Sequence, residues 1–188
     1  MNYVSLIGIG LFIWGLVTLD WFKAGVGVVI FLIAFAVHWF KIRDAAKDDK
    51  VFNSYKILHD LIGIISNSLK DSDSDMDSSK AKLATALFYF GMVDAASQTS
   101  RMNDKQFLNL VKIVFADLDY LFEKSYIDKI LLFHHTINTE HAAFQAIMKG
   151  GDMLTKFLNG NTMIPITAMM TIEELIEDPK FPASAEAL

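Results

Sequence analysis

Four residues with metal-binding side chains lie close together in the stretch HHTINTEH: His134, His135, Glu140 and His141. Imidazole and carboxylate groups are common ligands of zinc and other transition metals. In metalloproteases two histidines lie four residues apart on one helix, and a glutamate follows the first. Here His134 and His141 are seven residues apart, and a helix break is expected between them. The cluster is a candidate metal site. The alternative is a set of histidines at a corner between two helices, near a C-terminus whose dipole favours them.

The run DSDSDMDSS at 71–79 suggests a second candidate metal site, one for calcium. Its aspartates would occupy positions 1, 3, 5 and 7 of an EF-hand loop: Asp71, Asp73, Asp75 and Asp77. Position 6 is Met76 where that loop requires glycine, and position 12 is Lys82 where it requires a bidentate glutamate. The run is therefore predicted to be a solvated linker whose Asp and Ser side chains cap the next helix.

The rest of the chain offers few groups for catalysis. It contains no cysteine, so thiolate catalysis, disulfides and cysteine-based zinc sites are excluded. There is no G-x-S-x-G motif, and the G-x-G pairs at Gly8 and Gly25 lie in apolar runs. Asp94 stands among apolar residues. It is either a buried functional carboxylate or, as we favour, a partly exposed one near a helix end. No cofactor is predicted.

The charge of the chain argues against nucleic acid as a partner. Residues 51–188 contain 12 Lys and Arg and 18 Asp and Glu, a formal net charge of −6. An acidic domain repels the phosphate backbone. We therefore expect a protein partner or self-association rather than nucleic-acid binding.

The same region shows apolar residues at helical spacing, three or four positions apart, and no strand-like alternation. Asn103 and Gln106 form a variant capping box, and Pro165 fits the first turn of a last helix. Gly150-Gly151 is expected to end one helix, with Asp152 capping a short one after it. The predicted helices cover about 51–69, 80–97, 104–122, 126–136 and 139–149, with a short helix from 152 and a final one from 165 to 179.

These helices predict an all-α bundle of about six or seven helices in 51–188. The rows of apolar residues on helices 80–97 and 104–122 should meet in one hydrophobic core, because a short loop joins the two helices. The residues expected in that core are Leu87, Phe90, Phe107, Val111, Phe115 and Leu118.

Two strongly apolar runs, 2–19 and 21–40, precede this bundle. As helices at about 1.5 Å per residue, they would span about 27 and 30 Å, close to the ~30 Å hydrocarbon core of a bilayer. A turn near Asp20 and Lys23 would keep both charges at the membrane surface. The sequence therefore predicts a transmembrane hairpin over 1–40, a charged juxtamembrane linker over 41–50 and a cytoplasmic domain over 51–188.

The orientation follows from the basic residues after the second run: Lys41, Arg43, Lys47 and Lys50. Positively charged flanks stay on the cytoplasmic side, so both termini are expected in the cytoplasm. The expected localisation is the inner (plasma) membrane, as a multi-pass protein with the lipid bilayer as a partner.

The stretch LATALFYFGMVDAASQTSRMNDKQFLNLVKIVFADLDYLF, residues 83–122, resembles the helix–turn–helix unit of tellurite-resistance (TerB-like) helical domains. In those domains a helix rich in small residues ends in an acidic turn, and an acidic cap starts the next helix. The resemblance implies a helical fold. The family's turn usually carries D-G and a downstream glutamate thought to hold a metal. The matching positions 97–100 read SQTS, with Asp94 and Asp104 the only acids nearby.

The predicted function is a membrane-tethered protein-interaction module, since the chain lacks a catalytic motif and has 15 phenylalanines. It would be an accessory subunit of an inner-membrane assembly or an immunity- or defence-type protein. One alternative is a metal-binding enzyme that uses the histidine cluster. Another is a small oligomeric channel or transporter component built from the hairpins.

Overall fold

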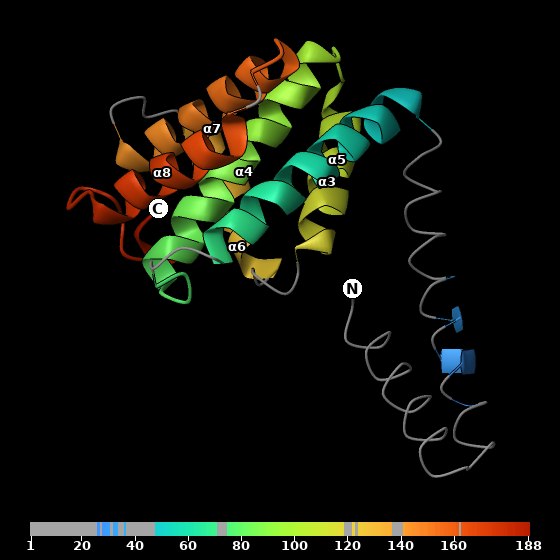
Figure 1. Cartoon of the computed structure of the whole chain (residues 1–188), viewed down its shortest axis with the longest axis horizontal. Helices are drawn as coiled ribbons and strands as arrows, with labels where there is room; N and C mark the ends of the chain where they lie inside the picture. The colour runs from blue at the N-terminus through green and yellow to red at the C-terminus, as the bar shows by residue number, and fades with distance from the viewer. Residues whose placement is uncertain are drawn as a thin grey trace. The chain divides into compact units, whose positions relative to one another are not determined.

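The computed structural model describes residues 26, 28–30, 32–33, 36, 48–70, 75–118, 122, 124–136, 141–161 and 163–188. The chain divides into two compact units, Met1–Lys47 and Asp48–Leu188. The described residues of both units hold helices and no strand, which confirms the all-α class (Figure 1). The helices of the second unit are α3 (Asp49–Lys70), α4 (Ser79–Thr99), α5 (Asp104–Asp117), α6 (Lys124–Thr136), α7 (Ala142–Leu158), α8 (Ile164–Glu177) and the short 3-10 helix η1 (Ala185–Ala187).

The predicted localisation requires correction. Among the residues that the structure describes, no helix is long and apolar enough to cross a membrane. This finding contradicts a multi-pass inner-membrane protein with both termini in the cytoplasm. The physical reason is that the long described helices carry charged side chains, as α3 does at Asp49, Lys56 and Asp60, or bury their apolar residues in the bundle, as α4 does. The predicted spans 2–19 and 21–40 fall almost entirely outside the described residues.

Helix α4 runs through the middle of the second unit (Figure 1). Its apolar residues lie on every side of the helix, and a helix of that kind must be covered on every side. It packs against α3, α5, α6, α7 and α8. As a result Leu83, Tyr89 and Met92 are completely buried.

The predicted core is confirmed. Its members on α4 and α5 are at most 5% exposed, except Phe107, which is partly buried and packs against the same core. The rings of Phe90 and Phe107 meet edge to face with centroids 6.0 Å apart. The buried members are Leu87, Phe90, Val111, Phe115 and Leu118.

The starts of two helices follow the predicted capping chemistry. The side chain of Asn103 accepts a hydrogen bond from the backbone of Gln106, whose side chain bonds back to the Asn103 backbone, so the capping box is confirmed. Ser78, in the acidic run, accepts from the backbone of Ala81 and caps α4, as expected of that run. Residues 71–74 of the run lie outside the described residues.

The predicted helix end at Gly150-Gly151 is wrong, because α7 continues through both glycines to Leu158. A Cβ on Gly150 would overlap the carbonyl group of Phe88 on α4, lying 2.9 Å from its carbonyl carbon. Reciprocally, a Cβ on Gly91 of α4 would lie 2.7 Å from the carbonyl carbon of Ile147 on α7. The glycines therefore bring the backbones of α4 and α7 into direct contact, rather than ending a helix.

Candidate functional site

His134, in the last turn of α6, points toward α4. Its ring packs edge to face on Phe90, with centroids 5.2 Å apart, and its Nε2 atom lies 3.9 Å from Oδ2 of Asp94. The ring of His135 is 6.1 Å away between centroids. His134 thus pairs with a carboxylate of α4 at the edge of the core.

His141 has a different role. It is the N-cap residue of α7, and its Nδ1 atom accepts a hydrogen bond of 3.2 Å from the backbone N–H of Ala143. Its ring packs edge to face on Phe133. The sequence predicted a helix from 139, whereas α7 begins at Ala142, and residues 137–140 lie outside the described part of the chain.

Glu140 also lies outside the described residues, so the set His134, His135, Glu140 and His141 stays a prediction as a whole. Within the described ranges no group of three or more His, Asp or Glu side chains is arranged to hold a metal ion. What the structure does bring together is His134 with Asp94, and capping occupies one ring nitrogen of His141.

Asp94 is partly exposed, as favoured from the sequence, with 21% of its side chain accessible. Its Oδ2 atom accepts a hydrogen bond of 2.8 Å from Nε2 of Gln98. Burial raises the pKa of the Asp94 carboxyl above its ordinary value of 3.8, while the charge of His134 and the bond from Gln98 act in the opposite direction. Burial is the largest of these effects, so the charged form is disfavoured in the folded protein.

We expect Asp94→Asn to stabilise the protein at neutral pH. A raised pKa means that the folded state binds the proton more readily than the unfolded state. Protonation of Asp94 therefore stabilises the folded state. This stabilisation is complete below pH 3.8, the ordinary pKa of the group, and is lost as the pH rises through its pKa in the folded state. An uncharged amide avoids that loss, so the melting temperature at pH 7 should rise.

The measurement is thermal unfolding of parent and variant at pH 7 and at pH 3.5. The difference between them should shrink at the lower pH. Asp152→Asn, at an exposed position of α7, serves as the control and should leave the melting temperature unchanged at both values. A loss of stability in the Asp94 variant at pH 7 would show that the pair with His134 outweighs burial.

A second cluster, which the sequence did not reveal, joins α3 to α5. The hydroxyl of Tyr55 donates a hydrogen bond to Oδ2 of Asp117, and Nδ1 of His59 lies 3.4 Å from the same oxygen. Burial, and then the Asp117 carboxylate, raise the pKa of Tyr55, so this hydroxyl stays protonated. Tyr55 and Asp117 are 62 residues apart, a separation at which no local spacing rule applies. The cluster ties two helices together.

A third feature is apolar and exposed. Ile57 and Ile64 lie two turns apart on one side of α3, and Ile166 and Met170 lie one turn apart on α8, which packs against α3. Together with Met163, just before α8, these side chains are 39–59% exposed. We call these five residues the α3/α8 face.

The placement of the α3/α8 face follows from the helical periodicity of both elements. On α3, Leu61 is buried at the edge of the buried stripe next to the two isoleucines, and Tyr55, at the other edge of this stripe, contacts α5. On α8 an ion pair of 3.5 Å between Glu174 and Lys149 marks the side that faces α7. Ile166 and Met170 lie on the outer side of α8, opposite the buried Ala168 and Ile172, and Met170 is one turn before Glu174.

No family model, curated protein or solved structure matches the chain. The resemblance of residues 83–122 to TerB-like domains therefore stays a prediction.

Proposed function

We propose that the unit Asp48–Leu188 is a protein-interaction module that binds an amphipathic, positively charged helix of another protein on the α3/α8 face. The observation that carries this proposal is the exposure of large apolar side chains on two adjacent helices: Ile57, Ile64, Met163, Ile166 and Met170. An accessory subunit of a larger assembly and an immunity-type protein both act through a surface of this kind.

The composition of the α3/α8 face supports binding over chance exposure. Single exposed apolar residues are common, but several on one face with a polar rim are typical of interaction sites. Two of the five are methionines, whose flexible, polarizable side chains adapt to a partner's surface. Leu132 on α6 is more exposed, at 70%, but it belongs to another helix and is a single residue.

The charge around the face supports a basic partner rather than a second copy of the chain. Glu177 is exposed and follows Met170 by seven residues, so it continues the exposed side of α8. Residues 51–188 carry a formal net charge of −6. Two such acidic faces would repel each other, whereas Lys or Arg beside an apolar stripe would be attracted.

The spacing of the exposed residues supports a helical partner. An amphipathic helix that binds to a hydrophobic surface carries its apolar anchors at positions i, i+3 or i+4 and i+7, over about two turns. Met163, just before α8, and Ile166 and Met170 on α8 extend over seven residues, and Ile57 and Ile64 on α3 are also seven residues apart. Each row therefore has the length of such a stripe of anchors.

The test uses two synthetic helical peptides with the same Leu/Ile stripe, one flanked by Lys and Arg and the other by Glu. Fluorescence anisotropy would follow the binding of each labelled peptide to the full chain. The basic peptide should bind at least 10-fold more tightly than the acidic one. Added salt should weaken binding of the basic peptide, because salt screens the attraction between exposed charges.

Met170→Lys and Leu132→Lys make a matched pair, since each adds one positive charge at an exposed apolar position. Met170→Lys should lower the affinity for the basic peptide at least 10-fold, because it introduces a charge among the apolar contacts. Leu132→Lys should leave the affinity within about 2-fold of the parent. Equal effects of the two substitutions would mean that charge alone attracts the peptide, and the proposal would be rejected.

A further inference from the structure

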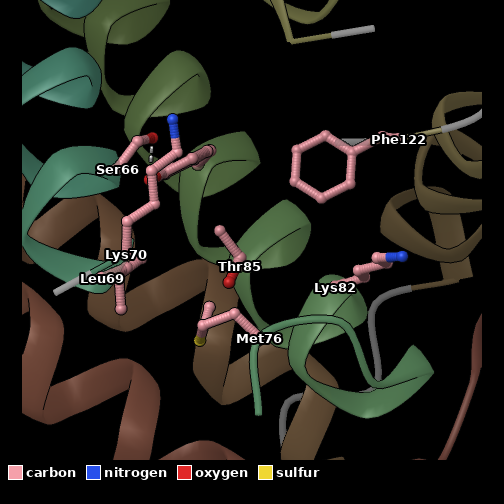
Figure 2. Close-up of a pocket in the computed structure, with 8 residues that line it drawn as sticks. Ser66, Leu69, Lys70, Met76, Lys82, Thr85 and Phe122 are labelled. Atoms are coloured by element: carbon pink, nitrogen blue, oxygen red, sulfur yellow. Dashed lines mark hydrogen bonds between the residues drawn. The ribbon is translucent and has the colours of Figure 1, made fainter. Parts of the chain in front are cut away.

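A small cavity lies between the C-terminal end of α3 and the N-terminal half of α4 (Figure 2). Its volume is about 50 Å³, and its walls are mostly apolar, with Leu69, Met76 and Phe122 among them. A cavity of roughly 150 Å³ holds a benzene molecule, so this one encloses only a few carbon atoms, and the rest of a larger ligand would lie at its open side. The α3/α8 face contributes no residue to it.

The polar residues of the cavity form two facing rows. On α4, Lys82, Thr85 and Tyr89 are three and four residues apart and so share one side of the helix. On α3, Ser66 and Lys70 are four residues apart and also line the cavity. The rows meet where Oγ of Ser66 and the Tyr89 hydroxyl form a buried hydrogen bond of 2.8 Å. Each row thus leads from an ammonium group to a hydroxyl group.

Thr85 stands out among these residues because its hydroxyl lacks a partner. Its side chain lines the cavity and is 3% exposed, and among the described residues its Oγ1 is the buried side-chain polar atom without a hydrogen bond. Figure 2 shows Thr85 above Met76, with Lys82 and Phe122 to its right and the nitrogen of Lys82 at the far end of its side chain. Leaving such a hydroxyl unpaired costs free energy, and that cost is recovered when a molecule in the cavity bonds to it.

We infer that the cavity is a binding site for a short-chain monocarboxylate. Thr85 and Lys82 lie one turn apart on α4, so one carboxylate can accept a hydrogen bond from the hydroxyl and pair with the ammonium group. The carbon chain then packs against Leu69, Met76 and Phe122. A doubly charged phosphate fits these apolar walls poorly, because the cost of removing a charge from water grows with the charge.

The acidic residues described beside the cavity do not compete for this position. Oδ1 of Asp75 accepts a hydrogen bond of 3.2 Å from the backbone of Asp77, and both side chains belong to the turn before α4. Both residues are exposed.

The test measures the thermal unfolding of the full chain with sodium acetate, butyrate and hexanoate, with 1-butanol and sodium chloride as controls. A ligand that binds only the folded state raises the melting temperature with its concentration. Butyrate should raise the melting temperature by several degrees at millimolar concentration. Butanol has a similar chain without the charge, and it should raise the temperature much less.

Three variants locate the site. Lys82→Met should lower the affinity for butyrate at least 10-fold. Lys56→Met, at an exposed lysine of α3, should leave this affinity unchanged. Thr85→Val keeps the shape of the side chain and removes the unpaired hydroxyl, so the free protein should become more stable while butyrate binds at least 10-fold more weakly.

Two results would overturn the inference. If the carboxylates shift the melting temperature no more than sodium chloride does, or shift Lys82→Met and the parent equally, they do not bind here. If Thr85→Val raises the stability of the free protein and leaves the butyrate affinity unchanged, an ordered water fills the cavity instead. Neither result bears on peptide binding at the α3/α8 face, which is tested separately.

Discussion

Gly150→Ala is expected to destabilise the helical unit by at least about 3 kcal/mol, beyond the usual cost of an extra methyl group in a core. A Cβ at this position would overlap the carbonyl group of Phe88. Side chains can rotate away from an added methyl group, whereas a helix backbone can only move as a whole. The new methyl group would therefore push α7 away from α4, along the contact that the two helices share.

Two other glycines provide matched controls. At Gly151 an added Cβ would meet its nearest atoms at 3.4 and 3.5 Å, which is ordinary contact, so Gly151→Ala should cost little. At Gly63, inside α3, it would meet nothing within 4 Å. Gly63→Ala should stabilise the protein by about 0.5–1 kcal/mol, since alanine favours a helix more than glycine does.

Chemical denaturation followed by circular dichroism would compare these variants with the parent. The expected order of stability is Gly63→Ala, parent, Gly151→Ala and, far below, Gly150→Ala. Similar stability for Gly150→Ala and Gly151→Ala would show that α4 and α7 do not meet at this point.

Phe90→Ala should have the second large effect, a loss of about 3–5 kcal/mol from a total stability of about 5–15 kcal/mol. Phe90 is completely buried in the middle of α4 and contacts the rings of Phe107 and His134. Removing its ring leaves a cavity that helices packed on every side of α4 cannot close.

Phe52→Ala is the control for this substitution, because Phe52 on α3 is 43% exposed and its truncation should cost less than about 1 kcal/mol. His134→Ala should also cost much less than Phe90→Ala, since His134 lies at the edge of the core. A loss in His134→Ala as large as that in Phe90→Ala would place a stabilising site at the histidine. Elemental analysis for bound metal would then be the next step.

The sequence predicted the positions of most helices in the second unit, because local signals determine them. The expected helix over 51–69 is α3 (Asp49–Lys70), and that over 80–97 is α4 (Ser79–Thr99). Helical spacing of apolar residues sets the buried side, and Asn103 with Gln106 sets the start of α5. Pro165 lies in the first turn of α8 as expected.

The error at Gly150-Gly151 shows what local signals omit. A glycine pair after an amphipathic segment has the composition of a helix end, and the alternative depends on a second helix 59 residues away along the chain, at Gly91. The continuous apolar character of α4 could have suggested that another helix approaches it closely. Nothing in the residues around 150 identifies that helix.

The candidate sites were still less predictable. The unpaired hydroxyl of Thr85 lines a cavity formed with residues of α3 and with Phe122, and the bond between Tyr55 and Asp117 joins two helices. The α3/α8 face combines residues more than 100 positions apart, and each looks in sequence like an ordinary member of an apolar stripe. Exposure, which distinguishes these residues from core residues, is a property of the packed bundle.

The most direct test of the proposed interaction module is a nuclear magnetic resonance titration of the full chain, labelled at its methionine methyl groups, with the basic amphipathic peptide. Met163 and Met170 belong to the α3/α8 face, Met148 is equally exposed on α7, and Met92 is buried in α4. We expect the signals of Met163 and Met170 to shift and saturate together while those of Met148 and Met92 stay in place. Shifts centred on Met148, or no saturable shift at Met163 and Met170, would contradict binding at the α3/α8 face.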